Sequence, residues 1–489
     1  MKSKSSKRHS TLSPVKQSAF WQSAFWGRSA VWFSGSGFLI MAILAQMLLR
    51  IGLFRLQFKG VNFFGEDSGV YYQVAKDLRP LESVWPKGWP WVLKGFLSIS
   101  DSPLFLLVVQ SLFGLAAQCL FIATAVKFGR RSLFLATILS IPFFYNPFWI
   151  RLNSLILMPD TISIFLVALT GFYGLKYFFE EESPVCGPTI LSFLLGSIIF
   201  FKRILKVWSP LIFLMLLVRA VTHRKSKVVA ILILSFFSGP LIYIFTVLHP
   251  TFGTYDPDTF SGFSIFDNLL ASTNCNDLSA SLPFIQKRAA FDQICTPELL
   301  NHPGWYQLWR PQGLIRVVSQ NLFLSLTPIE RNKIYQSWAL NLMWMNPMTP
   351  IRAIWQNFSF YLSHDPPETL GFFKKPNLIG CEVPIKTFFQ MDLSAYQQGA
   401  SQFSLDRQGA LKGVDWISAM GWYLMRLACI VLGFYIVVTT WRKVQKSLFF
   451  VVAAIIYGMA AFLGNSYEPR SYFILDFLLM TAVALLEIA

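Results

Sequence analysis

The chain has 489 residues, of which 54% are hydrophobic and only 14% charged, and 48 of them are phenylalanines. Soluble domains carry about 25% charged residues, so this composition excludes an ordinary soluble protein. Apolar runs of about 20 residues, the length that crosses a bilayer core, recur along the chain. These runs are continuous rather than alternating, which favours helices over a β-barrel. We therefore expect an all-α polytopic membrane protein.

The net charge of +17 is compatible with nucleic-acid binding, so its position decides its meaning. Acids and bases nearly balance in the segment 249–417, and the positive charge lies in the N-terminal tail and in short connections. This distribution is typical of the positive-inside rule of membrane proteins. A surface for DNA or RNA is the weaker interpretation.

Residues 1–35 are predicted to be a cytoplasmic tail. The opening MKSKSSKRHSTLSPVKQ is basic and holds no acid. The following SAFWQSAFWGRSAVWF places Trp and Phe every few residues, as an interfacial amphipathic helix does. No small-residue cleavage site follows the first apolar run, so we expect that run to stay as a helix.

About ten transmembrane helices are expected, in a transmembrane module 36–248 and in C-terminal helices 418–489. The predicted spans are 36–54, 103–126, 132–149, 161–178, 188–201, 207–222, 228–248, 418–439, 447–463 and 471–487.

With the tail inside, the connections alternate between the two sides of the membrane. The inner ones are 127–131, 176–183, 222–227 and 441–446, and most of them are basic. The outer ones are 55–102, 151–160, 201–208, 249–417 and 464–471. The basic outer connection FKRILKVW (201–208) opposes the rule, which invites a functional explanation.

The first outer connection carries an acidic pair, Glu66-Asp67, in FFGEDSGVYYQVAKDL. Two readings stay open for these residues: solvated loop carboxylates, or a general base held at the membrane surface. The aromatic stretches after the pair, among them WPKGWPWVL (85–93), favour the second reading, because they resemble interfacial helices.

The second and third outer connections add an acid and three cations. Asp160 stands at the lip of a predicted span, where it is either a helix N-cap or part of a site. Lys202, Arg203 and Lys206 are either snorkelling cations or a phosphate site. Arg470, at the lip of the last span, is another cation of the same side.

The outer segment 249–417 is predicted to be a partly helical domain that rests on the membrane. Cys275 and Cys295 lie in it, and spacing alone leaves their pairing open, with Cys381 left over if they join. An aromatic cluster with one cation is either the core of the domain or a contact for an acceptor: Trp305, Tyr306, Trp309 and Arg310. Cys119 and Cys429 are expected to be core residues of the spans.

The order of these motifs resembles the GT-C superfamily of membrane glycosyltransferases, which includes protein O-mannosyltransferases and lipid A aminoarabinose transferases. The matching elements are the acidic pair followed by Tyr71 or Tyr72, WPKGWPWVL, VKFGRRSLFLA, PFFYNPFWIRLNSLILMPD, KRILKVWSPL, MNPMTPIRAIW and EPRSYFIL. The chain departs from the family pattern in the proline before Asp160 and in an outer domain placed between spans.

This resemblance implies an inverting transfer of a sugar, a hexose or pentose, from a polyprenyl phosphate to an acceptor hydroxyl. Asp67 would be the base and Glu66 its neighbour, while Asp160 would orient the acceptor or a cation. Lys202, Arg203, Lys206 and Arg470 would hold the departing phosphate. Some members bind a divalent metal ion beside the first-loop acid, and the sequence leaves this open. The family also implies a bacterial inner membrane with a periplasmic site.

Three alternatives remain. A transporter or flippase would place ionisable residues deep inside the spans, and only Arg50, Arg219, Arg426 and Asp476 are of this kind. An outer-face oligosaccharide polymerase or ligase would rely on arginines of the large outer segment. A structural assembly protein would need no chemistry. Histidines are too scattered for a His-based metal cluster.

Overall fold

The computed structural model describes residues 36–56, 68–77, 88–151, 159–180, 186–202, 205–222, 226–252, 261–300, 312–363, 385–386, 390–439, 441–464 and 469–486. Every regular element among these residues is a helix, so the all-α prediction is confirmed for the described part of the chain.

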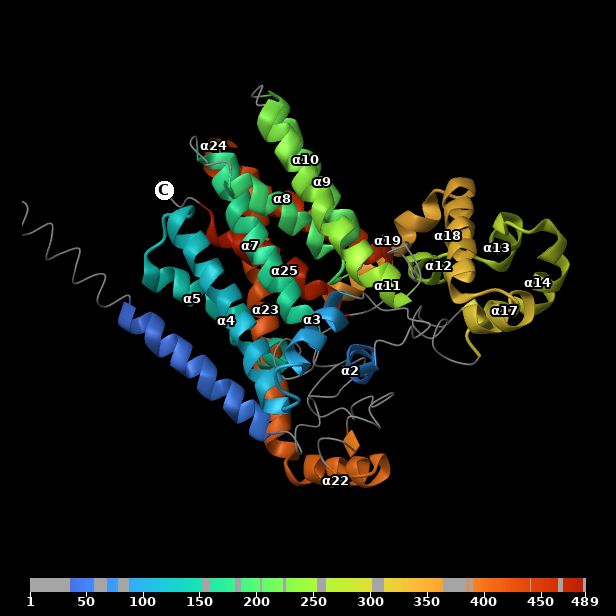
Figure 1. The fold of residues 1–489 in the computed structure, drawn as a ribbon, viewed down its shortest axis with the longest axis horizontal. Coiled ribbons are helices and arrows are strands. Elements are labelled where there is room, and N and C mark those ends of the chain that lie inside the picture. The colour runs from blue at the N-terminus through green and yellow to red at the C-terminus, as the bar shows by residue number, and fades with distance from the viewer. Residues whose placement is uncertain are drawn as a thin grey trace, which may run out of the picture.

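Six helices of the described residues are long and apolar enough to cross a membrane, which indicates a multi-pass membrane protein (Figure 1). They are Ser36–Arg55, α4 (Pro103–Lys127), α7 (Asp160–Phe179), α10 (Ser226–Tyr243) with its π-helical continuation η3 (Ile244–Leu248), α23 (Gln408–Val438) and α24 (Trp441–Gly464). Four shorter apolar helices occupy the other predicted spans: α5 (Leu133–Phe144), α8 (Cys186–Ile198), α9 (Leu205–Thr222) and α25 (Pro469–Ala484).

The remaining helices lie in the connections. Between the first spans these are α2 (Ser68–Asp77), α3 (Gly88–Leu97) and α6 (Pro147–Ile150). The long outer segment holds α11 (His249–Phe252), α12 (Ser261–Leu270), α13 (Cys275–Ser281), η4 (Ile285–Lys287), α14 (Arg288–Ile294), α15 (Pro297–Leu300), α17 (Leu314–Leu322), α18 (Pro328–Met345), α19 (Met348–Ser363) and α22 (Leu393–Asp406).

Local sequence explains where several helices begin. The side chain of Asn146 accepts from the backbone N–H groups of Phe148 and Trp149, and Pro147 follows as the first residue of α6. Thr327 and Glu330 form a reciprocal capping box at the start of α18, again with a proline in the first turn. The motif YNP (145–147) stands at the junction of two helices: α5 ends at Phe144, and α6 starts at Pro147.

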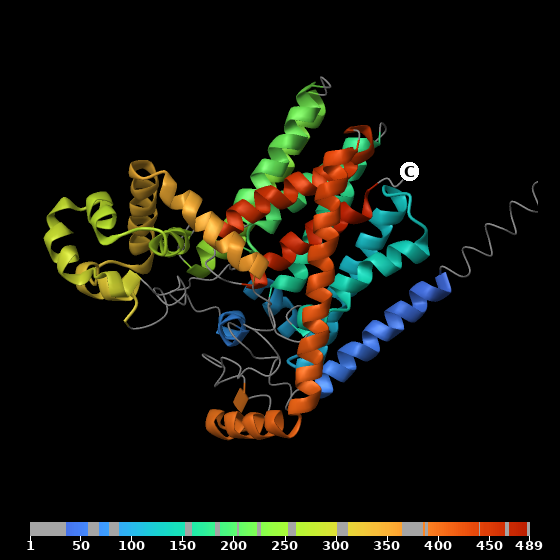
Figure 2. The ribbon, with the colours of Figure 1, turned by 180° about the vertical axis from the view of Figure 1, so that it is seen from behind.

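The last helix, α25, packs in the middle of the membrane bundle (Figure 2). The ring centroid of its Phe477 lies 6.3 Å from that of Phe121 in α4 and 5.7 Å from that of Phe143 in α5. Aromatic pairs at these separations stabilise a core beyond the area they bury. Helices from the two ends of the sequence thus share one core.

Connections that the sequence places on the inner side meet at one end of the bundle. Lys127 pairs with Glu180 at 2.6 Å, which joins the α4–α5 and α7–α8 connections. Lys446 Nζ donates to the carbonyl oxygen of Phe128 at 3.1 Å, which brings in the start of α24. Their meeting agrees with the alternation expected from the sequence.

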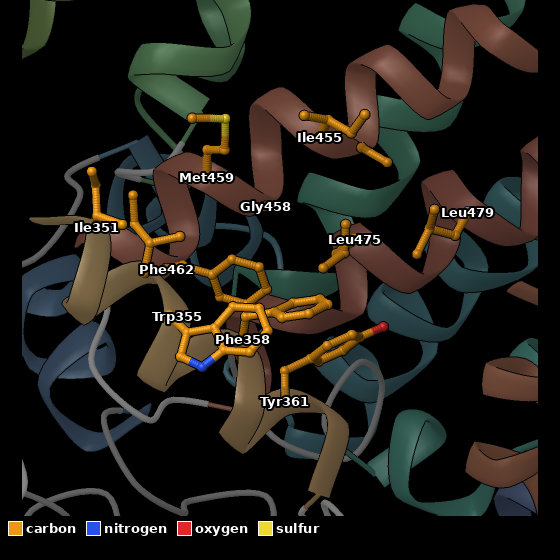
Figure 3. A pocket seen from close by; sticks show the side chains of 12 residues that line it. Ile351, Trp355, Phe358, Tyr361, Ile455, Gly458, Met459, Phe462, Leu475 and Leu479 are labelled. Carbon is orange, nitrogen blue, oxygen red and sulfur yellow. The ribbon is translucent and has the colours of Figure 1, made fainter. Parts of the chain in front are cut away.

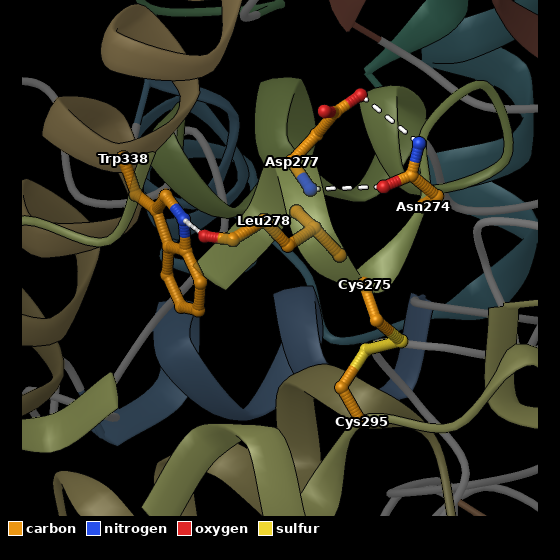
Figure 4. The surroundings of a disulfide bond; sticks show 6 residues. All are labelled: Asn274, Cys275, Asp277, Leu278, Cys295 and Trp338. Atoms are coloured by element: carbon orange, nitrogen blue, oxygen red, sulfur yellow. Dashed lines mark hydrogen bonds between the residues drawn. A yellow bond between two sulfur atoms is a disulfide. The ribbon is translucent and has the colours of Figure 1, made fainter. Parts of the chain in front are cut away.

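The outer segment contains a domain with a core of its own, formed by α12 to α18. Trp338 is fully buried in it and donates from Nε1 to the carbonyl oxygen of Leu278 at 2.9 Å (Figure 4). Cys275 and Cys295 form a disulfide at the edge of this core, which resolves the pairing that spacing left open. Cys381 lies outside the described residues.

The later part of the outer segment belongs to the membrane bundle instead. Tyr361 of α19 and Tyr396 of α22 are buried in the bundle core, and α23 begins at Gln408, ten residues before the expected start of its span. The prediction of one domain over 249–417 thus covers two different parts of the structure.

The core prediction for Cys119 is wrong, because its side chain is exposed on the surface of α4. Cys429 of α23 is half-buried. One side of a membrane span faces lipid and the other faces the protein core. Both surroundings are apolar, so the sequence does not show which side a residue such as Cys119 occupies.

Candidate functional site

Asp160 and Lys202 form a buried ion pair. Lys202 Nζ lies 2.6 Å from Asp160 Oδ1, and the side chains are only 13% and 6% exposed, respectively. Asp160 is the first residue of α7, and Lys202 follows the turn that ends α8. The fold therefore joins two predicted site residues from two different outer connections.

The positions of Asp160 and Lys202 bear on the alternative roles that the sequence left open, a helix cap for Asp160 and a snorkelling cation for Lys202. Pro159, and not Asp160, occupies the N-cap of α7, and the cap makes no side-chain hydrogen bond. Asp160 is the first residue of the helix and bonds to Lys202 from its first turn. Lys202 is partly buried, and its Nζ bonds to the carboxylate of Asp160. A buried pair of this kind carries a desolvation cost, and polar groups kept at such a cost are candidates for function.

The first outer connection reaches the same place through α3. The backbone N–H of Gly88 donates to the carbonyl oxygen of Phe200 at 3.0 Å, two residues before Lys202. A Cβ at position 88 would lie 2.7 Å from that oxygen, so only glycine fits. The WPKGWPWVL element thus packs directly on the turn that carries Lys202.

Buried aromatic side chains surround this junction. Tyr71 and Tyr72 of α2, and Trp89 of α3, are each less than 4% exposed. At the outer surface of the same pair of helices, Lys76 Nζ bonds to Asp101 at 2.7 Å. That hydrogen bond raises the pKa of Lys76. The burial of the three aromatic side chains shows that one face of each helix packs against the protein.

Lys206 adds a second cation, half-buried in the first turn of α9. Lys202 and Lys206 give this connection two cations, four positions apart. Charge-assisted hydrogen bonds from such groups bind phosphate oxygens well. Lys202 and Lys206 are therefore the candidates for binding an anion near Asp160.

The sequence argument missed Arg151, which is buried at the end of α6. It is the only charged residue between Arg131 and Asp160, and that isolation was the available signal. The same connection is fixed to α23, because Asn146 Nδ2 donates to the carbonyl oxygen of Ser418 at 2.8 Å.

The other predicted site residues are not placed. Glu66, Asp67, Arg203, Trp305, Tyr306, Trp309 and Arg310 lie outside the described residues, as does the side chain of Arg470. Within the described part of the chain, no group of three His, Cys, Asp or Glu side chains could hold a metal ion.

A second buried polar cluster lies inside the bundle. The Tyr361 hydroxyl of α19 donates to Asp476 Oδ1 of α25 at 2.6 Å. Arg426 of α23 donates to the carbonyl oxygens of Tyr361 and Leu362, each at 2.6 Å. The sequence shows Asp476 and Arg426 as isolated charges inside two predicted spans. It does not show that both bind α19.

Comparison with protein-family models, with curated protein sequences and with solved structures finds no match for this chain.

Proposed function

We propose that the chain is an integral membrane glycosyltransferase of the GT-C type, which moves a sugar from a polyprenyl phosphate to an acceptor hydroxyl. The observation that carries this proposal is the buried Asp160–Lys202 pair, in contact with the turn on which α3 packs. Three outer connections that carry motifs of the GT-C resemblance thereby meet at one place.

The proposed roles follow from charge. Lys202 and Lys206, together with Arg203 and Arg470, bind the phosphate of the donor and stabilise the charge it gains on leaving. Asp160 orients Lys202 by the ion pair. Trp305, Tyr306, Trp309 and Arg310 of the outer segment contact the acceptor.

In the reaction, the acceptor oxygen attacks the anomeric carbon and its proton passes to the carboxylate of Asp67. The bond between the anomeric carbon and the phosphate oxygen breaks, and its electron pair stays on the phosphate. Attack opposite the leaving group inverts the anomeric centre.

The proposal includes ten membrane spans, with α5, α8, α9 and α25 crossing beside the six longer helices. Short helices can cross where the bilayer thins or where neighbouring helices cover their ends. It also includes a bacterial inner membrane, with the Asp160–Lys202 end on the periplasmic side.

The test compares surface glycans of cells that lack the protein and are rescued with wild type, Asp67→Asn or Asp101→Asn. Asp101 is an exposed acid of the same outer connection and serves as the control. We expect wild type and the control to restore a missing sugar and Asp67→Asn to fail at equal expression. Equal rescue by all three would end the proposal.

A transporter or flippase is the second candidate, and the buried Asp476–Tyr361 pair favours it. Acids inside a bundle often belong to a translocation path. For a transporter, Asp476→Asn would stop movement of a substrate across the membrane, and Asp67→Asn would leave that movement intact. Loss of sugar transfer with Asp67→Asn alone selects the transferase.

A further inference from the structure

Helix α19 forms one wall of an apolar groove of about 520 Å³. Figure 3 shows Ile351, Trp355 and Phe358 of α19 facing Ile455 and Met459 of α24, with Leu475 of α25 behind them. Volumes of 300 to 1,000 Å³ are typical of small-molecule sites. Almost no polar surface lines this one.

The groove is held open by fixed walls. One face of α19 is buried and carries its anchors: Asn357 Nδ2 donates to the carbonyl oxygen of Phe462 at 2.8 Å, and Tyr361 bonds to Asp476. These contacts attach the second half of α19 to α24 and α25. The space beside them is therefore bounded by helices that are bonded to one another.

A second face of α19 is apolar and exposed. Met348, Ile351 and Trp355 recur at helical spacing and are 49%, 55% and 65% exposed. The exposed positions beside this stripe are polar, Arg352 and Gln356. Such a helix suits the boundary between hydrocarbon and head groups.

The opposite wall of the groove, on α24, belongs to a candidate membrane span. Ile455 and Met459 are each 54% exposed and lie inside the candidate membrane span of α24. The groove therefore opens toward lipid, where an extended protein segment would find no partner for its backbone polar groups.

We propose that this groove is a binding site for one acyl chain of a membrane phospholipid, which packs between α19 and the helices α24 and α25. Recognition rests on the hydrocarbon alone, because the lining offers no charged group. Phospholipid is the commonest hydrocarbon ligand in a bilayer, so mass action favours it. The proposal does not depend on sugar transfer.

The test uses the full chain, extracted from membranes in mild detergent, and measures retained lipid by native mass spectrometry. Met459→Trp fills the groove from α24, and Gly458→Leu fills it from the floor, where a Cβ would make ordinary 3.5 Å contacts with Leu475 and Phe462. Val437→Trp is the control, because Val437 is 83% exposed on α23 and does not line the groove.

We expect a retained phospholipid on the wild type and on Val437→Trp, with at least a fivefold lower occupancy on both groove variants. Wild-type thermal stability of one groove variant shows that its fold is intact. Absence of bound phospholipid on the wild type, equal loss on the control, or retention of a polyprenyl lipid alone would overturn the proposal.

Discussion

The hydroxyl of Tyr361 donates a 2.6 Å hydrogen bond to Oδ1 of Asp476, across 115 positions of sequence, and both side chains are buried. This bond ties a helix of the outer segment to the last membrane helix. We expect Tyr361→Phe to lower the free energy of unfolding by about 1 to 3 kcal/mol, because it leaves a buried carboxyl oxygen without its donor. Thermal unfolding in detergent measures the change. The half-exposed Tyr423 gives the control Tyr423→Phe, and an equal effect there would contradict the prediction.

The Asp160–Lys202 pair is expected to matter for activity beyond stability. Lys202→Met alone leaves a buried carboxylate and should cost about 3 to 5 kcal/mol. The double variant Asp160→Leu/Lys202→Met removes both charges and should regain most of that stability. For the proposed transferase, sugar transfer by the double variant should still be lower by about 10²-fold or more, because the proposed phosphate contact is missing.

The control for this pair is Lys76→Met, which breaks the exposed pair with Asp101 at the surface of α2. Exposed pairs contribute about 0 to 1 kcal/mol, so both stability and transfer should stay near wild type. Full activity of the Asp160→Leu/Lys202→Met variant would show that the pair is not needed for catalysis.

Gly88→Ala should disturb the junction of the outer connections. The added Cβ would lie 2.7 Å from the carbonyl oxygen of Phe200, a backbone atom that cannot move alone. Gly95→Ala in the same helix has open space and should stabilise α3 by up to about 1 kcal/mol. Limited proteolysis in membranes compares the two variants, and we expect α3 to be cleaved faster in Gly88→Ala than in Gly95→Ala. Equal protection would show that the close contact between Gly88 and Phe200 is not needed.

The Cys275–Cys295 disulfide is expected to stabilise the outer domain. Closing a loop of 20 residues restricts the unfolded chain, which amounts to about 3 kcal/mol. Replacing both cysteines with serine should therefore make this domain susceptible to protease at a lower temperature, with the membrane helices unaffected. A thiol reagent that labels Cys275 in the native protein before any reduction would contradict the assignment.

The capping box of α18 predicts a pH dependence. The backbone N–H of Thr327 donates to Glu330, and this bond lowers the pKa of that carboxyl. The stabilisation is therefore complete above the unfolded pKa, about 4.3, and is lost as the pH falls through the lower folded value. Protease protection of α18 between pH 6 and pH 3 measures it. Glu330→Gln keeps an acceptor without a titrating proton, so its protection should not change with pH in that interval.

Much of the fold could be predicted from the sequence, because a bilayer demands long apolar runs and each run became a helix. The faces of those helices could not be predicted. Cys119 is exposed although its span looks uniformly apolar, since lipid and core are equally apolar. The sequence also does not show which core each helix of the outer segment joins, because the amphipathic pattern of α19 does not tell water from lipid.

For the candidate site, the residue types were predicted but their contacts were not. Asp160 and Lys202 were both selected, for different roles, and nothing in a spacing of 42 residues indicates that they bond. Spacing also left the disulfide undecided, because it does not give the distance between two Cα atoms. Tertiary packing decides both.

The position of α25 has a consequence for biosynthesis. Phe477 packs on Phe121 and Phe143, which leave the ribosome more than 330 residues earlier. At 5 to 20 residues per second, the early helices wait roughly 20 to 70 s in the membrane for their central partner. During that interval their aromatic faces are open to neighbouring chains. The packing of the early helices is therefore completed only when the last helix arrives.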